Sequence, residues 1–593
     1  MKHLFLFLFL LSFSGLSAQE ELAKLYFNDG EFEKAVVFFE KLVERNPRRT
    51  DYTEKLVQCY QQLEAYDKAI AMLTERVEAG TVYPTLLIDL GYTYRLKGQP
   101  EVSDTWYERA LDAIEDNPNM GYGIGFKFQR YTLLEYALRA YRSAMALNPE
   151  LDFNFQIARI YGEQGKIQQM FEAYMELLLQ RPSSKPNVLR VLEGFISSDP
   201  GDETNVLLRK VLLKRAQKSP NPLWNELLSW VFLQEGQYAA AFNQEKAIYR
   251  RSETPDLDRM FSLADVAESN GDLEAAERAF SFVVSEATEA PMRLNAQLHL
   301  VDIGLKAGPE PDLQAARRDY ERLLDAYGYA TATLQLQVAF AKFLAFRLDE
   351  AQEGIGLLRK SLELPMSGYS EGFLKMTLGD LLVYDQQFNE ALILYSQVQK
   401  RLKNDVIGQQ ARFKVAQTSF YKGDFEWALT QLKVLRNSTS QLIANDAMKL
   451  SKVISDNAHE DSTQTALKKF ARADLLAYQQ KNDAALEVLK QLLSEHKGEK
   501  IEDEALLKQG GLLEEAGDYQ GALLSYRKII EFYGNGILAD DAYFATAELY
   551  RNRLGEPEKA MEHYQQIIFR YPDSYFFPQA RRQFRLLRGD NLE

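Results

Sequence analysis

Cysteine and histidine are scarce in this chain of 593 residues. The single cysteine, Cys59, excludes a disulfide framework and a zinc finger with cysteine ligands. We expect Cys59 to be an inert, partly buried thiol. The histidines are far apart and form no His-Glu-x-x-His motif, although a metal site assembled from distant segments stays open. We therefore expect no catalytic residue, no metal and no cofactor. The histidines are His3, His299, His459, His496 and His563.

Positively charged residues are the minority, because the chain has 70 Lys and Arg but 85 Asp and Glu, which gives a net charge of −15. Nucleic acid is therefore excluded as the main partner, since its recognition needs a clustered positive surface. With 33 glycines and 18 prolines the chain is too poor in both for a collagen. The hydrophobic content of 46% is that of a folded protein.

Long apolar runs are absent after the first residues. Residues 1–18 have the pattern of a secretory signal peptide, with Lys2 before the apolar run Leu4–Phe13 and a small-residue end. Cleavage after Ser17 and cleavage after Ala18 are both compatible with the sequence, and a retained anchor is the alternative reading. No later segment is long and apolar enough to cross a bilayer, so we expect no transmembrane segment in the mature chain.

A pattern with a period of about 34 residues runs along the chain. Tyr26, Tyr60 and Tyr94 are in register, and the Gly30 of the first copy returns as Gly98 in the third. The spacing resembles the tetratricopeptide repeat, in which each copy is a pair of antiparallel helices. This resemblance implies an all-α fold, an α-solenoid forming a right-handed superhelix of roughly 14 or 15 helix pairs.

One copy illustrates the physical reason for the pattern. Ile157, Ala158 and Tyr161 fall on one face of a first helix, and small Ala158 lets the second helix approach closely. Gly165 tolerates the left-handed conformation that ends the first helix, and Pro182 cannot continue the second.

The rhythm of the pattern predicts how the chain is organised. Residues 183–222 carry two helical patterns without the glycine and alanine signature, so we interpret them as one degenerate repeat. Residues 455–464 are polar and form either a hinge or a long loop within one solenoid. The predicted segments are 1–18 (signal peptide), 19–182 (regular array), 183–222, 223–454 (middle array), 455–464 and 465–593 (C-terminal repeats with a capping helix).

Three short segments match consensus motifs of functional sites, but their sequence context does not support the function. Gly368–Gly372 matches Gly-x-Ser-x-Gly, but no strand precedes it, so we interpret it as a loop between repeats. Gly121–Gly125 is glycine-rich but lacks the lysine of a phosphate-binding loop, and we interpret it as a loop or a helix start. Arg588–Asp590 matches an adhesion tripeptide, and we interpret it as the end of a capping helix.

In the resembled family, four spaced positions of each first helix line an inner face. Some members carry there a clamp of lysine, asparagine and arginine side chains that grips chaperone tails. The corresponding positions here do not carry that set, so this clamp is missing. They are Glu20, Lys24, Lys55, Thr85 and Asp89.

When the same inner-face positions of the family are transferred to the third, fourth and fifth copies, they predict an apolar strip for partner binding. Exposed aromatic patches usually mark partner sites, although packing between repeats is the competing reading. The residues of the predicted strip are Ile88, Tyr92, Tyr122, Phe126 and Phe155, flanked by Arg95 and Arg159.

The C-terminal copies, such as residues 571–580, are similar to repeats in periplasmic and outer-membrane proteins of diderm bacteria. The whole chain resembles long exported tetratricopeptide proteins of Bacteroidetes-type bacteria. The resemblance implies a non-catalytic scaffold at the periplasmic face of the outer membrane or in the periplasm, after Sec-type export. Its partners would be proteins of outer-membrane assembly, secretion or uptake, with membrane association only through a partner. A periplasmic regulator of a peptidoglycan-processing enzyme is the alternative.

Overall fold

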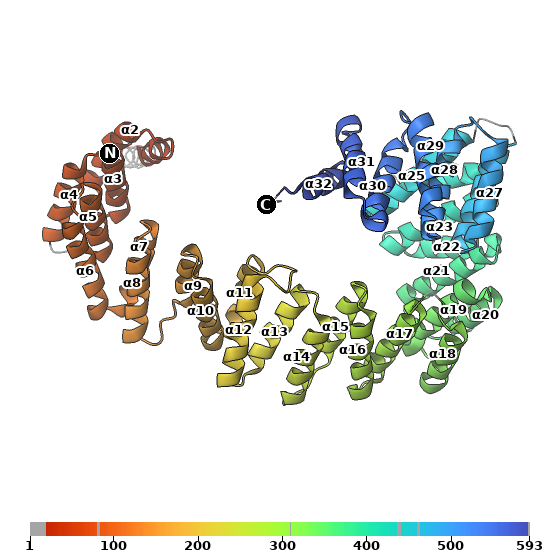
Figure 1. Cartoon of the computed structure of the whole chain (residues 1–593), viewed down its shortest axis with the longest axis horizontal. Helices are drawn as coiled ribbons and strands as arrows, with labels where there is room; N and C mark the ends of the chain where they lie inside the picture. Colours follow the sequence, from red (N-terminus) through yellow and green to blue (C-terminus); the bar gives the residue numbers. More distant parts are fainter. Residues whose placement is uncertain (1–18, 80–82, 309, 436–439, 459–462, 591–593) are drawn as a thin grey trace, which may run out of the picture. The chain divides into compact units, whose positions relative to one another are not determined.

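The computed structural model describes residues 19–79, 83–308, 310–435, 440–458 and 463–590 (Figure 1). Every regular element in these ranges is a helix, and none of these residues lies in a strand. The prediction of an all-α solenoid of helix pairs is therefore confirmed. The predicted signal peptide, residues 1–18, lies outside the described residues. Among the residues described, no helix combines the length and the apolar character that a membrane crossing needs.

The chain divides into two compact units, residues 1–276 and 277–593. The first unit begins with a helix whose described part covers residues 19–28, and most later helices follow as antiparallel pairs. Its helices are α2 (Phe32–Arg45), α3 (Thr50–Gln62), α4 (Tyr66–Glu78), α5 (Pro84–Leu96), α6 (Pro100–Asp116), α7 (Gly121–Arg130), α8 (Leu134–Leu147), α9 (Asn154–Glu163), α10 (Ile167–Gln180), α11 (Lys185–Glu193), α12 (Glu203–Lys218), α13 (Pro222–Gln234), α14 (Tyr238–Arg251) and α15 (Asp258–Ser269).

The second unit continues the same construction, and α16 (Leu273–Glu286) runs across the division. Its further helices are α17 (Ala290–Lys306), α18 (Leu313–Tyr327), α19 (Leu334–Leu348), α20 (Ala351–Ser361), α21 (Gly368–Tyr384), α22 (Phe388–Arg401), α23 (Val406–Lys422), α24 (Phe425–Leu435), α25 (Gln441–Asn457), α26 (Thr465–Tyr478), α27 (Asn482–Glu495), α28 (Ile501–Glu515), α29 (Tyr519–Phe532), α30 (Ala539–Leu549), α31 (Pro557–Arg570) and α32 (Phe577–Arg588). A π-helical turn, Tyr550–Leu554, extends α30.

The turn between the two helices of a pair is short. In the pair α9 and α10, Gly165 has a φ of 70°, a left-handed conformation that glycine adopts without a steric penalty. Its amide hydrogen-bonds the carbonyl of Gly162 and closes the end of the first helix. The role predicted for Gly165 is confirmed.

First and second helices of a pair approach closely where a small residue faces a large one. Gly91, Gly125, Gly379 and Gly510 each lie so close to a tyrosine ring of the second helix that a Cβ would clash with it. In the pair α9 and α10 fully buried Ala158 takes this place, as its small size predicts. Small residues on first helices are therefore what allows tyrosines to fill the middle of these pairs.

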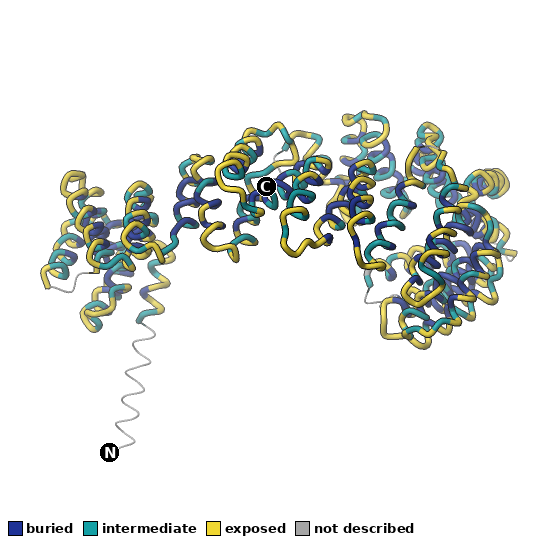
Figure 2. The backbone as a smooth tube through the Cα atoms, turned by 90° about the horizontal axis from the view of Figure 1, so that it is seen from below, coloured by how far each residue is buried: buried dark blue, intermediate teal, exposed yellow. Residues whose placement is uncertain are grey.

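The apolar core is a chain of separate clusters rather than one centre. One cluster joins α5 to α13, for example, and another joins α23 to α28. Figure 2 shows the result along single helices, where buried and exposed stretches alternate because each helix turns one face to its neighbours. Each cluster is shared by consecutive pairs, so no single pair could bury its own apolar face.

The degenerate segment contains α11 and α12, joined by the longer loop 194–202. Fully buried Asn205 holds this loop, because its side-chain amide donates to the carbonyls of Ser197 at 2.8 Å and Asp199 at 3.1 Å. Of the polar stretch 455–464, residues 455–457 form the last turn of α25, and residues 459–462 lie outside the described residues. The hinge and the other segment boundaries stay predictions.

Candidate protein-interaction surface

The seven predicted strip residues lie on three first helices of the first unit, α5, α7 and α9. On these helices Gly91, Gly125 and Ala158 lie at the contacts with the second helices α6, α8 and α10. Consecutive first helices α5 and α7 are in contact with each other. The predicted register of this region therefore agrees with the structure.

Tyr122 and Phe126 are the exposed centre of the strip. They lie one turn apart on α7, with 48% and 49% of their surfaces exposed, and their rings stack with centroids 6.1 Å apart. Tyr122 also contacts buried Phe153, with ring centroids 6.2 Å apart. Two large rings held on a rigid helix present apolar area to a partner at a small entropic cost.

Tyr92 and Phe155 are half-buried, so they are shared between the surface and the packing. Tyr92 stacks on Tyr131 with ring centroids 4.0 Å apart, and Phe155 contacts Tyr174 edge to face. These two rings contribute less free surface than Tyr122 and Phe126.

Arg95 and Arg159 are exposed, as predicted for the flanking charges of the strip. Arg159 lies 3.9 Å from Glu163 on the same helix, and both side chains remain largely accessible to solvent. Exposed charges of this kind orient a partner and speed its association more than they add affinity.

The prediction for Ile88 is wrong, because its side chain is fully buried. Ile88 belongs to the apolar cluster that also contains Ile124 and Phe128 of α7. The cause is the close packing of α5 on α7, which covers a position that the family pattern places on the inner face. Ile88 is therefore a core residue and does not line the strip.

A buried ion pair connects α5 to α7 beside the strip. The Lys127 Nζ lies 2.9 Å from Asp89 Oδ1 and 3.2 Å from Glu54 Oε2 of α3, and Tyr131 donates a hydrogen bond to Asp89. Burial raises the pKa of Asp89 to about 6, against the opposing effect of the Lys127 charge. This pair was not predicted from the sequence, although a charge inside an otherwise apolar helix face is the signal that could have revealed it.

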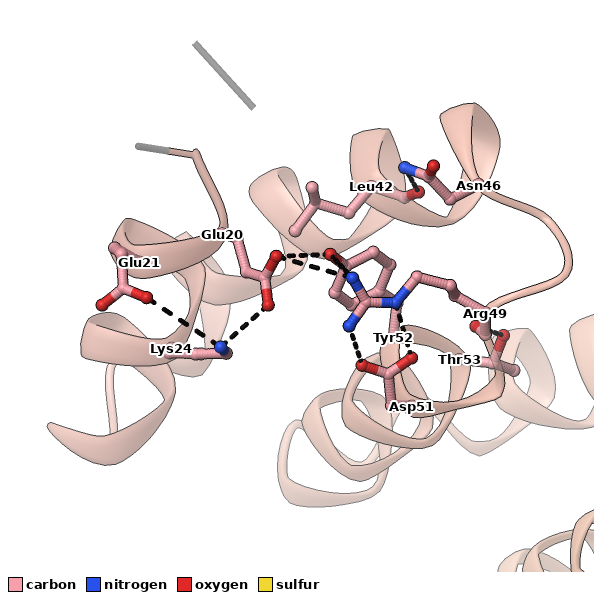
Figure 3. A network of polar contacts seen from close by, with 9 residues as sticks. All are labelled: Glu20, Glu21, Lys24, Leu42, Asn46, Arg49, Asp51, Tyr52 and Thr53. Atoms are coloured by element: carbon pink, nitrogen blue, oxygen red, sulfur yellow. Dashed lines mark hydrogen bonds and ion pairs between the residues drawn. The ribbon is translucent and has the colours of Figure 1, made fainter. Parts of the chain in front are cut away.

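Two of the positions that would carry a clamp, Glu20 and Lys24, are engaged within the chain. Tyr52 donates a hydrogen bond to Glu20 at 2.6 Å, and Lys24 lies 2.8 Å from the same carboxylate (Figure 3). Arg49, whose guanidinium lies 3.6 Å from Glu20, also pairs with Asp51. These contacts tie the first described helix to α3, so the side chains stabilise packing between neighbouring helices.

The remaining sequence motifs are parts of helices. Gly368–Gly372 forms the first turn of α21, where the Ser367 side chain accepts a hydrogen bond from the Ser370 amide, so its interpretation as a loop between repeats is wrong. Gly121–Gly125 begins α7, which is one of its two predicted interpretations. Asp590 binds the side chains of Arg585 and Arg588 at the end of α32.

Cys59 is fully buried on α3, and burial raises the pKa of its thiol to about 12. The thiol is therefore held in its unreactive form at neutral pH. The prediction of an inert cysteine agrees with this environment.

Models of the tetratricopeptide repeat match residues 16–49, 84–117, 470–537 and 541–574. Residues 84–117 span α5 and α6, and residues 541–574 span most of α30 and all of α31. Segments that match the tetratricopeptide-repeat models therefore lie in both units.

Two relatives are similar to parts of the chain. The TPR repeat-containing protein MJ1428 of Methanocaldococcus jannaschii is 26% identical over 191 residues, which are 30% of this chain and 31% of that protein. The TPR repeat-containing protein YpiA of Bacillus subtilis is 22% identical over 234 residues, which are 39% of this chain and 54% of that protein. The chain thus spans 31% and 54% of the lengths of these relatives.

Solved structures of helical-repeat proteins are similar over nearly the whole chain. Naa15/Naa10 bound to HypK-THB has a TM-score of 0.32 at 11% identity, covering 96% of this chain and 88% of that chain. Yeast Tom70 has a TM-score of 0.28 at 14% identity, covering 95% of this chain and 99% of that chain.

Proposed function

We propose that this chain is a non-catalytic scaffold that is exported and binds proteins of the cell envelope through the surface of its helix pairs. Tetratricopeptide-repeat solenoids serve as protein-interaction scaffolds, because stacked pairs present a long surface without an enclosed reaction chamber. The observation that carries the proposal is the stacked, half-exposed pair Tyr122 and Phe126. The part of the partner that binds there is an apolar segment.

The exported location rests on residues 1–18, whose charge and apolar run are those of a secretory signal. Amino-terminal sequencing of the protein from fractionated source cells tests this part. We expect a first residue near Ala18 or Gln19 in an envelope fraction. Recovery of Met1, or a pool confined to the cytosol, would contradict export.

The binding surface is tested by affinity capture of the tagged full chain from crosslinked cells. We expect Tyr122→Ala with Phe126→Ala to weaken partner capture by about 30-fold, since truncating a hot-spot residue costs about 2 kcal/mol or more. The thermal midpoint should stay nearly unchanged, because both rings are half-exposed.

A matched control exists on α21. Tyr369 and Phe373 have the same residue types and the same spacing as Tyr122 and Phe126, and are 59% and 45% exposed. Tyr369→Ala with Phe373→Ala should leave capture unchanged. If the Tyr122 and Phe126 variant instead melts several degrees lower and retains the partner, the strip is core and the proposal fails.

A further inference from the structure

Helix α25 is unusual among the described helices of the second unit, because it stands between two complete pairs. α23 pairs with α24 and α26 pairs with α27, and the first helices α23 and α26 contact each other directly. α25 packs on α24 and also contacts the first helices α23 and α28. It therefore lies against the first helices without a second helix of its own.

The contact face of α25 is that of an amphipathic helix. Ile443, Ala447 and Ile454 are buried on it, whereas Leu442 and Met448 are 71% and 48% exposed. Those three buried residues belong to the apolar cluster that contains Phe420, Leu467 and Phe470 of α23 and α26. The helix thus covers apolar side chains of other first helices.

The repeat register shows that the surface covered by α25 corresponds to the strip of the first unit. Ala473 and Ala485 have the same spacing as Gly125 and Ala137, so Phe470 stands in α26 where Tyr122 stands in α7. Tyr122 is 48% exposed, but Phe470 is only 8% exposed. A position that is open in α7 is therefore covered in α26, and α25 belongs to the cluster that covers it.

Helix α25 does not fill all of the space beside these first helices. A cavity of about 430 Å³ remains between α25, α26, α28 and α30. We call its wall the C-terminal groove and define it by Phe470, Glu504, Leu507 and Asp541; Val453, Lys449 and Lys452 of α25 face it. Outside α25 the lining carries three carboxyl groups, Glu504, Glu515 and Asp541, and one lysine, Lys508, beside its apolar walls.

Two carboxyl groups of the groove, Glu504 and Asp541, have raised pKa values. Glu504 Oε2 is buried and has no hydrogen-bond partner among the described residues. Burial, followed by the neighbouring Asp503, raises the pKa of Glu504 to about 9. Burial and Asp540 raise the pKa of Asp541 to about 6, and Lys449 only partly opposes this. A cation placed between these carboxylates would stabilise their charged forms.

We propose that the surface under α25 and the C-terminal groove beside it together bind an amphipathic helix of a partner protein that carries a lysine or arginine, and that α25 covers this surface until the partner displaces it. The inference rests on the proposed scaffold function and names the kind of segment bound. Charge complementarity supports it, because the walls other than α25 carry three carboxyl groups against one lysine, and α25 itself presents Lys449 and Lys452 to them. The unfilled volume beside α25 supports displacement, because a helix with a longer basic side chain would fill the cavity and pair with Glu504 and Asp541.

The test uses the full chain and a synthetic peptide of residues 441–457 with a fluorescent label. In the released variant, Ile443→Glu, Ala447→Glu and Ile454→Glu weaken the contact face of α25 in the chain. We expect the peptide to bind the released variant at least about tenfold more tightly than the unaltered chain, where α25 competes for the site. A peptide with the same three substitutions is the control and should not bind.

A second peptide tests the role of charge. Val453→Arg in the peptide places a guanidinium beside the groove, and we expect about tenfold tighter binding to the released variant. Glu504→Gln with Asp541→Asn in the released variant should remove this gain, and it should weaken the unchanged peptide by less, through the loss of the attraction between Lys449 and Asp541. Equal affinities of the two peptides would overturn the basic character assigned to the partner.

Hydrogen exchange of the unaltered chain keeps the proposal testable if the released variant unfolds. We expect the amides of α25 to exchange faster than those of α23 and α28, because displacement requires local opening. Equal protection of all three helices, or failure of the peptide to bind a folded released variant, would make α25 a permanent part of the core and overturn the proposal. These measurements need no cellular partner, so they fail or succeed independently of capture through Tyr122 and Phe126.

Discussion

The Cα of Gly125 faces the ring of Tyr141 so closely that a Cβ would lie 2.5 Å from the ring carbon Cε1. Tyr141 itself is fully buried in the middle of its pair. The same relationship joins Gly91 to Tyr107 and Gly510 to Tyr526. Close approach of the two helices therefore depends on the absence of a side chain at one position.

Gly125→Ala should lower the free energy of unfolding by about 1–3 kcal/mol, because the added methyl group overpacks the pair α7 and α8. Gly123→Ala is the matched control on the same helix, since a Cβ there meets nothing within 4 Å. The control should be neutral or stabilising by up to about 1 kcal/mol, as expected for alanine in a helix. Denaturant unfolding measures both. Equal stability of the two variants would contradict the described packing.

Lys127→Met should destabilise the contact of α5 with α7 by about 3–5 kcal/mol, because it leaves the carboxylate of Asp89 buried without its cation. Lys127→Met with Asp89→Asn should cost less than Lys127→Met alone, since no buried charge then remains.

The penalty of Lys127→Met should shrink on acidification. The pKa of Asp89 is raised to about 6 with Lys127 in place and lies higher without that cation, so acidification protonates the carboxylate and removes the unpaired charge. Unfolding measured at pH 8 and pH 5 tests the sign. A penalty that grows at pH 5 would exclude Asp89 as its source.

Glu504 should make the chain less stable as the pH rises. Its pKa is raised from 4.5 to about 9, so the folded chain holds a proton that the unfolded chain releases, and stability falls from pH 4.5 through pH 9. Glu504→Gln keeps a neutral side chain and should reduce the drop in thermal midpoint between pH 6 and pH 9. Glu487→Gln, at an exposed position of α27, is the control and should leave that drop unchanged.

Cys59 should resist thiol reagents in the folded chain. Burial raises its pKa to about 12, so neither access nor thiolate is available near neutral pH. Mass spectrometry after maleimide treatment should show no adduct in buffer and one in concentrated urea. Rapid labelling in buffer would mean that α3 opens frequently.

The sequence was sufficient to predict the helix pairs and the exposed centre of the strip. Tyr26, Tyr60 and Tyr94 set the register, and that register placed Tyr122 and Phe126 correctly at the surface. It failed for Ile88, because burial there depends on how closely α5 packs on α7. A repeat pattern specifies which face a residue occupies but not the angle between neighbouring pairs.

Helix α25 could not be recognised in advance for a related reason. Its apolar residues Ile443, Ala447 and Ile454 have the spacing of any amphipathic helix, so the middle array was predicted without an unpaired member. Periodicity reveals that a face is buried, but it does not identify what buries it. The ion pair of Asp89 and Lys127 escaped detection because its two members lie on different helices.

Because the apolar core is divided into separate clusters, parts of the chain can unfold one at a time under force. The cluster from α5 to α13 and the cluster from α23 to α28 can each lose cohesion while the other remains intact, because their contacts are local. Under tension between its ends, the chain should lengthen in several small steps instead of rupturing once.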